Sequence, residues 1–157
     1  MVSIGKRVVH EYVQRNPASC ELVFPLICPV REAEWLPGWK YRLIHSNSGL
    51  AELGCVFATP APDGSEQTWI VTQHDPRHLQ IHFCWIRPGM IATRLEIALK
   101  PEGSDETRTY IRYTYTGLSE AGNRELDGYD ENWFLTKMLG WEKAINHYLR
   151  TGEKTAA

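Results

Sequence analysis

No excess of basic residues marks this chain: 17 Lys and Arg stand against 19 Asp and Glu, and the formal net charge is −2. Proteins that cover nucleic acid or an anionic membrane surface usually carry a basic excess, so we expect neither as a partner. The longest apolar run, residues 22–30, contains two prolines and is too short to cross a bilayer. Membrane insertion is therefore not expected.

Cysteine is scarce, and its spacing points to no site. Cys20, Cys28, Cys55 and Cys84 form no C-x-x-C pair. Residues 1–7 include two basic residues, but no apolar stretch of signal-peptide length follows them. The even count would allow two disulfides, yet without a secretion signal reduced thiols are favoured. We expect small buried thiols and a cytoplasmic protein.

Catalytic signatures are missing as well. The sequence contains no G-x-S-x-G, no Gly-rich phosphate loop and no H-E-x-x-H, the patterns that mark a nucleophile, a nucleotide site or a zinc site. His74, His78 and His82 recur every fourth residue, but Asp75 and Pro76 interrupt them in a segment of strand composition, which disfavours a three-histidine zinc site. The sequence predicts no metal, no cofactor and no specific catalytic residue.

Aromatic residues, in contrast, are plentiful. The chain has six Trp, seven Tyr and four Phe within a composition that is 43% hydrophobic and 23% charged, which is typical of a globular protein. A chain of 157 residues forms one ordinary domain and buries about 68–70% of its unfolded surface. We expect a single domain over residues 1–157, with 153–157 as a frayed tail.

A period of two residues dominates the middle of the chain. The breaks between the alternating segments carry Gly, Pro, Asn or Asp, as tight connections require. The expected strands are 6–14, 41–45, 50–59, 66–74, 78–86, 90–100 and 107–116. Because the last six are joined by short connections, neighbouring strands should pair antiparallel.

Helical patterns flank these strands. Short helices are expected over 17–23, with Asn16 as N-cap, and over 30–35, whereas 117–128 is expected to be a linker. Beyond the linker the period becomes 3.6, which predicts an amphipathic helix of about twenty residues that ends at Gly152. Its apolar stripe consists of Phe134, Met138, Trp141, Ile145 and Tyr148.

This order of elements predicts an α+β fold in which a curved seven-stranded antiparallel sheet wraps around the C-terminal helix, with two short helices after the first strand. A straight helix cannot fill a strongly curved sheet, so a space should remain between them. Aromatic side chains that point into this space would line a binding pocket.

Four segments resemble the START-related superfamily of helix-grip proteins (the SRPBCC type), which includes lipid-transfer domains, polyketide cyclases and the birch-pollen-allergen type. They are 18–24 after the first strand, 35–39 before the second, 54–57 in the third and 141–149 in the C-terminal helix. The likeness, which is greatest to bacterial members, covers nearly the whole chain. It implies the helix-grip fold and the binding of a hydrophobic small molecule.

Candidate cavity residues come from three regions. At the expected cavity mouth lie Arg31, Glu34, Trp35 and Trp39; there Arg31 either pairs with Glu34 on one helical turn or meets an anionic ligand head. The sheet and the C-terminal helix contribute Trp69, His82, Leu95, Ile97, Ile111, Tyr113, Tyr115, Phe134, Met138 and Trp141. For each aromatic residue the alternative is plain core packing, and for His82 it is a solvated side chain.

Three functions are compatible with these expectations. The favoured one is binding or transfer of a hydrophobic, lipid- or polyketide-like molecule in the cavity, without catalysis. A cyclase or dehydratase would instead need a cavity group of perturbed pKa, with His82, Tyr113 or Glu34 as proton carriers. A protein-interaction module, related to activators of heat-shock ATPases, would expose a large apolar patch; its protein partner is unknown.

Overall fold

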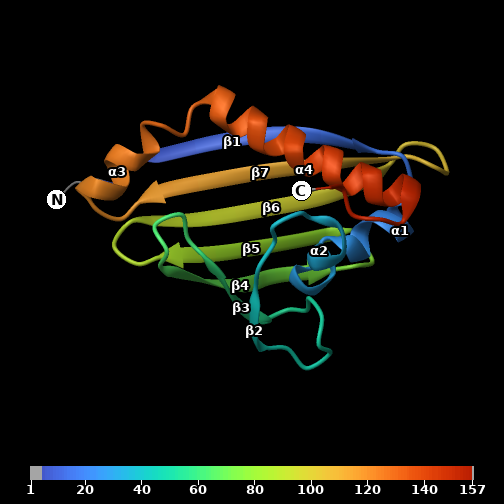
Figure 1. Cartoon of the computed structure of the whole chain (residues 1–157), viewed down its shortest axis with the longest axis horizontal. Helices are drawn as coiled ribbons and strands as arrows, with labels where there is room; N and C mark the ends of the chain where they lie inside the picture. The colour runs from blue at the N-terminus through green and yellow to red at the C-terminus, as the bar shows by residue number, and fades with distance from the viewer. Residues whose placement is uncertain (1–4, 157) are drawn as a thin grey trace.

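One antiparallel sheet of seven strands carries the fold, in the order β1-β7-β6-β5-β4-β3-β2. The computed structural model describes residues 5–156 (Figure 1). The strands are β1 (Arg7–Asn16), β2 (Arg42–His45), β3 (Val56–Pro60), β4 (Glu66–Asp75), β5 (Gln80–Arg87), β6 (Ile91–Pro101) and β7 (Thr107–Gly117). Each strand from β2 to β7 pairs with its neighbour in sequence, and β1 joins the free edge of β7, so the predicted sheet is confirmed.

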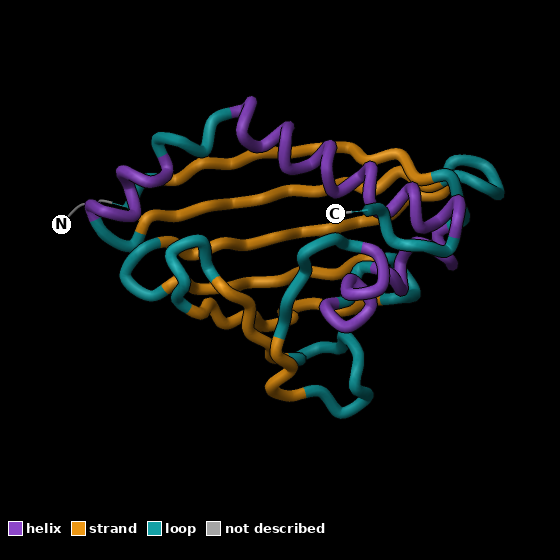
Figure 2. The backbone as a smooth tube through the Cα atoms, viewed as in Figure 1, coloured by secondary structure: helices purple, strands orange, loops and turns teal. Residues whose placement is uncertain are grey.

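The helices gather on one side of this sheet (Figure 2). After β1 come α1 (Cys20–Val23), a 3-10 turn (Phe24–Leu26) and α2 (Pro29–Trp35); after β7 come α3 (Glu120–Leu126) and α4 (Glu131–Thr151). Helix α4 packs against β1 and α2, and α3 packs against β7. Within residues 5–156, none of these helices is long and apolar enough to span a membrane.

Strict alternation along the central strands produces the buried face. Ile91, Thr93, Leu95, Ile97 and Leu99 of β6 are all buried, whereas the residues between them are more exposed. In the sheet, Leu95 lies opposite Phe83 of β5 and Tyr113 of β7. The candidate cavity residues of β6 and β7, Leu95, Ile97, Ile111, Tyr113 and Tyr115, are all buried.

Helix α4 has well-defined ends. The Asp130 carboxylate caps the first turn by accepting a hydrogen bond from the backbone N–H of Trp133 at 2.8 Å. The helix ends at Gly152, whose φ of 73° is left-handed and favours glycine. Between these ends, Phe134, Met138 and Ile145 are buried against the sheet, as the apolar stripe predicted.

The expected linker over 117–128 is wrong, because most of it is helix α3. The Ser119 hydroxyl caps this helix by accepting from Gly122 N–H at 3.0 Å. Gly122 also lets the helix approach the sheet: a Cβ at this position would lie 1.8 Å from the carbonyl oxygen of Met90. Docking on the β5–β6 turn thus permits a helix in a segment whose Gly and Asn content suggested a loop.

Two expected boundaries also move. The strand expected over 50–59 begins only at Val56, because the residues before it form a loop in which the Glu52 carboxylate accepts from Ser48 N–H at 2.6 Å. The helix expected over 17–23 begins at Cys20. The four cysteines are free thiols, and three of them are buried.

At one end of α4 the interior is filled by a network of buried polar side chains. Asn146 accepts a hydrogen bond from Asn16 at 2.8 Å and donates one to the carbonyl of Arg15 at 2.8 Å. Asn16 also accepts from Thr109 at 2.7 Å and donates to Gln14 at 2.9 Å. These contacts join β1, β7 and α4 into one closed end.

Candidate functional site

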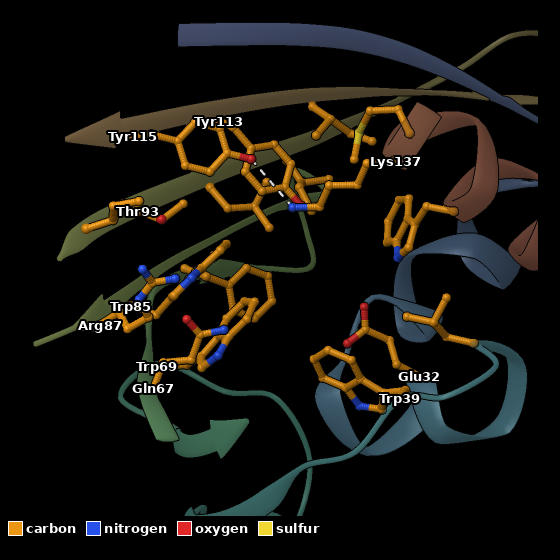
Figure 3. Close-up of a pocket in the computed structure, with 18 of the residues that line it drawn as sticks. Glu32, Trp39, Gln67, Trp69, Trp85, Arg87, Thr93, Tyr113, Tyr115 and Lys137 are labelled. Atoms are coloured by element: carbon orange, nitrogen blue, oxygen red, sulfur yellow. Dashed lines mark hydrogen bonds between the residues drawn. The ribbon is translucent and has the colours of Figure 1, made fainter. Parts of the chain in front are cut away.

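A cavity of about 270 Å³ lies between the inner face of the sheet, α2 and α4 (Figure 3). Alternate residues of β3 to β7 form its floor, and side chains of α2 and α4 form its roof. The predicted space between the helix and the curved sheet is therefore present.

Stacked indoles form one wall of this cavity. Trp69 of β4 and Trp85 of β5 are cross-strand partners, and their rings stack with centroids 3.6 Å apart and an interplanar angle of 18°. The Trp39 ring meets the Trp69 ring edge to face, and the Phe57 ring stacks on Trp69 with the ring centroids 5.1 Å apart. A hydrogen bond from Trp69 Nε1 to the Thr59 hydroxyl, 2.8 Å long, holds the ring in place. The wall is flat, rigid and apolar.

A second aromatic group surrounds the amine of Lys137. Its Nζ lies 4.4 Å from the centroid of the Tyr113 ring and donates to the Tyr115 hydroxyl at 3.5 Å (Figure 3). The ring of Trp133, one helical turn earlier, lies 5.5 Å away. None of the acidic residues that the structure describes lies within ion-pairing distance of Nζ.

These surroundings change the basicity of Lys137. By surface area the side chain is exposed, so the amine can be reached, but the apolar atoms crowded around Nζ disfavour the ammonium form and lower its pKa to about 8. Near neutral pH a fraction of the chains therefore carries a neutral, nucleophilic amine at this position.

Glu32 on α2 places a carboxyl group on the opposite part of the wall. The side chain points into the cavity (Figure 3), and burial away from bulk water raises its pKa to about 8, although a contact with the Trp141 side chain acts in the opposite direction. At neutral pH this carboxyl is mostly protonated, so it can donate a hydrogen bond or a proton.

Arg87 seals the end of the cavity near α3. Its side chain is 7% exposed and forms an ion pair with Glu125 of α3. Glu125 also accepts a hydrogen bond from the Tyr129 hydroxyl at 2.8 Å. The Arg87 guanidinium lowers the pKa of Glu125, so the pair stays ionised, and its two charges neutralise each other.

Comparison with known proteins gives matches at the level of structure. No protein-family model and no curated protein sequence matches the chain. Norcoclaurine synthase from Thalictrum flavum superposes with a TM-score of 0.65 at 15% identity, over 94% of this chain and 88% of that one. Ara h 8.0201 gives 0.65 at 12%, over 93% and 99%, and a hypothetical protein from Helicobacter pylori gives 0.67 at 11%, over 91% and 87%.

The chain has the helix-grip fold that these solved structures share. Structural likeness at such low sequence identity shows the fold alone, so the chemistry of the cavity has to be argued from the residues of this chain.

Most of the predicted site residues line the helix-grip cavity. The structure brings together nine of the fourteen: Trp39, Trp69, Leu95, Ile97, Ile111, Tyr113, Tyr115, Met138 and Trp141. They come from β4, β6, β7, α4 and the segment after α2, as the alternation and the helical stripe placed them. Their role in binding stays a prediction.

Three residues expected at the cavity mouth lie elsewhere. Arg31 and Glu34 pair on the outer side of α2, with Nε and Oε2 2.6 Å apart, and Glu34 also accepts from the Tyr148 hydroxyl at 3.0 Å. Trp35 is fully buried, and its Nε1 donates to the carbonyl of Leu26 at 3.0 Å. These residues are not on the cavity wall, because the inner face of α2 instead presents Glu32 and buries Trp35 in the core.

His82 and Phe134 also lie off the wall. Alternation along β5 turns Phe83 and Trp85 inward and therefore places His82 on the outer face, where burial lowers its pKa. Phe134 is buried in the core, with its ring stacked on His10 at 4.8 Å. It supports Tyr113 from behind at a centroid distance of 5.5 Å.

Two titratable side chains of the cavity, Glu32 and Lys137, were not predicted, although the sequence holds a signal for each. Glu32 lies one helical turn before Trp35, the most buried residue of α2. Lys137 lies four residues after Trp133 and four before Trp141, on the aromatic side of α4. Counting only apolar residues in each stripe passes over such polar members.

The three spaced histidines do not converge. His78 contacts Asp75 at 2.7 Å, His74 lies against Phe24, and His82 is on the outer face of β5. Over residues 5–156, no three His, Cys, Asp or Glu side chains gather closely enough to hold a metal ion.

Proposed function

We propose that this protein binds a small, planar, hydrophobic molecule in the cavity between the sheet and α4. The observation that carries the proposal is the aromatic wall: the stacked Trp69 and Trp85 indoles face a space that is partly enclosed by α2 and α4. Apolar walls with a few polar groups are typical of small-molecule sites.

The size of the cavity supports a compact ligand. Its volume of about 270 Å³ is close to the lower end, about 300 Å³, of the range for small-molecule sites. One or two fused rings fit this volume better than a long acyl chain. A norcoclaurine synthase structure is described as a complex with dopamine and hydroxybenzaldehyde, which supports the proposal that this fold can hold single-ring aromatics.

Binding of a panel of ligands tests the proposal. Native mass spectrometry and tryptophan fluorescence should detect saturable one-to-one binding of bicyclic aromatics such as 2-naphthalenemethanol, and weaker binding of long-chain fatty acids. Thr93→Phe adds a ring to a buried position on the cavity wall, and we expect it to weaken binding at least tenfold.

The matched control uses the same strand pair. Thr114 faces the outer surface next to Arg94 of β6, so Thr114→Phe adds the same side chain outside the cavity and should leave affinity within a factor of two. Equal affinities for the two variants, or no binding across the whole panel, would overturn the proposal.

An enzyme of the cyclase or dehydratase type is a second candidate, favoured by two cavity groups whose pKa lies near neutrality. Glu32 and Lys137 both have a pKa of about 8, within the range in which general acids and bases work best. Of the expected proton carriers, Tyr113 lines the cavity, whereas His82 and Glu34 do not. Turnover of a poly-β-carbonyl chain by the wild type, and its loss in Glu32→Gln, would support this candidate.

The outer face of the sheet gives less support to a protein partner. Exposed apolar side chains fall on β1 and β7, where Val13 pairs with Tyr110, and on β4 and β5, which carry Ile70 and Ile86. Glu96 of β6, the strand between these groups, lies opposite Arg112 of β7. The charges divide the apolar surface, so this face favours no partner of defined chemistry.

A further inference from the structure

We propose that the Lys137 amine forms a reversible imine with an aldehyde or ketone group on the aromatic ligand. The inference rests on the proposed function, because the carbonyl compound must first occupy the cavity. It assigns that compound a chemical class, an aromatic carbonyl, and gives the cavity a reaction as well as a shape.

The position of the amine carries the inference. Lys137 lies between Trp133 and Trp141 on the cavity side of α4, and its Nζ is 4.4 Å from the centroid of Tyr113. A flat ligand lying along these rings would bring a ring substituent next to Nζ. The other five lysines of the chain are absent from the cavity wall.

The state of the amine distinguishes it from the second cation of the cavity. Arg87 is neutralised by Glu125, whereas no acidic residue among those that the structure describes lies within 4 Å of Lys137. A lysine in apolar surroundings with no counter-ion is the form that reacts with carbonyl groups. With a pKa of about 8, about a tenth of the amine is neutral at pH 7.

The reaction balances without an oxidant or a reductant. The Nζ lone pair forms a bond to the carbonyl carbon as the C=O π bond breaks, and one amine proton moves to the oxygen, which becomes a hydroxyl. Cleavage of the C–O bond with uptake of a further proton releases water and leaves a protonated C=N bond, which then loses its N–H proton to solvent. Glu32, which is protonated at neutral pH and lines the same cavity, can supply the proton that the departing oxygen needs.

Simple ion pairing is the competing explanation for an amine in this place, because a carboxylate on the ligand would also be attracted to it. Imine formation and ion pairing differ in one respect. Only the imine becomes a permanent secondary amine when a hydride donor reduces it, so chemical trapping separates the two.

The experiment incubates the protein with 2-naphthaldehyde and sodium cyanoborohydride, followed by intact mass and peptide analysis. We expect one adduct per chain, located on the peptide that contains Lys137, and no adduct on this peptide in Lys137→Arg, which keeps the charge but cannot form the imine. Lys143→Arg changes an exposed lysine on the same helix and should label like the wild type.

The pH dependence and Glu32→Gln sharpen the test. Besides Lys137, the titratable and charged groups that line the cavity are Tyr113 and Tyr115 from β7, Arg87 from β5, Tyr129 before α4, and Glu32 from α2. The initial rate of labelling should rise with pH up to about 8, and Glu32→Gln should label at least fivefold more slowly at pH 7.

The alcohol 2-naphthalenemethanol separates the possible failures. If it binds in the cavity but the aldehyde labels Lys137 no faster than Lys143, the imine is excluded and the proposed function stands. If 2-naphthoate binds tightly under the same conditions, ion pairing replaces the imine. If neither the alcohol nor the aldehyde binds, the proposed function itself fails.

Discussion

Helix α4 borders two different interiors. Around Asn146 its polar side chains are matched: Asn146, Asn16 and Thr109 exchange hydrogen bonds of 2.7–2.8 Å. Around Lys137 charges are not paired, since the amine faces aromatic rings and the Glu32 carboxyl on the opposite part of the wall has no basic partner within 4 Å among residues 5–156. The same helix therefore closes the fold at one end and borders a hollow with unpaired ionisable groups at the other.

This difference is what the proposed binding function predicts for the two ends. Buried polar groups normally find partners, and departures from that rule concentrate at functional sites. Two buried donors lack an acceptor among the described residues: Gln14 Nε2 at the closed end and Arg87 Nε on the cavity wall. The unmatched groups of the open end can be matched by a ligand.

The largest loss of stability from a single substitution is expected at the closed end. Asn146→Ala removes the acceptor for Asn16 and the donor for the Arg15 carbonyl, and it leaves buried groups unpaired. We expect the free energy of unfolding to fall by about 2–3 kcal/mol, measured by urea denaturation, with ligand binding retained below the transition.

Asn132→Ala is the matched control, because Asn132 is exposed on the same helix. Its effect on the free energy of unfolding should stay within about 0.5 kcal/mol. Equal effects at the two positions would contradict the contrast between a closed end and an open one.

The pH dependence of stability tests the open end. The folded chain keeps the Glu32 proton up to a pKa of about 8, whereas the unfolded chain releases it near the model value of 4.5. Between these pH values the folded state binds the extra proton, so stability falls by up to about 1.4 kcal/mol for each pH unit. Glu32→Gln should remove this slope; a slope shared by wild type and variant would show that Glu32 is solvated.

Lys137→Met should change stability less than Glu32→Gln does, and the pH dependence that it removes has the opposite sign. Below pH 8 the folded chain carries an ammonium in apolar surroundings, so replacing it with an apolar side chain of similar length should raise the thermal midpoint at pH 7. The advantage should shrink as pH rises from 8 to 10.5, where the wild type loses this charge on folding. A variant less stable than the wild type at pH 7 would refute this explanation of the lowered pKa.

The smallest effect is expected at the pair that lies outside the cavity. Arg31→Ala removes the bond to Glu34 on α2 and should lower stability by about 0.2–0.5 kcal/mol, with ligand affinity unchanged within a factor of two. A tenfold loss of affinity would restore Arg31 to the binding site.

The sheet and α4 could be predicted because their patterns are strong and local. The alternating residues of β6 and β7 that were expected in the cavity do line it: Leu95, Ile97, Ile111, Tyr113 and Tyr115. Helix α3 could not be predicted in the same way, since its formation depends on the contact of Gly122 with Met90, 32 positions earlier in the chain.

The site was harder to predict than the fold. A periodic pattern predicts which face of a helix or strand a side chain is on, but it does not distinguish a core position from a position on the cavity wall. The sequence gives no reason to treat Trp35 and Trp39 differently, and both were expected at the cavity mouth. Trp35 is nevertheless fully buried in the core, whereas Trp39 borders the cavity. The unmatched state of Lys137 depends on which carboxylates lie nearby in three dimensions. Only the packing of α4 on the sheet determines that.

The most direct test of the central claim is a titration with 2-naphthalenemethanol that follows the six tryptophan indole N–H signals by NMR. A guest in the hollow should shift the signals of Trp69 and Trp85, which form its wall, with one common saturation curve. The signal of Trp35, whose indole N–H donates a hydrogen bond to the Leu26 carbonyl in the core, should move much less. Saturable binding that leaves Trp69 and Trp85 unmoved would contradict the account.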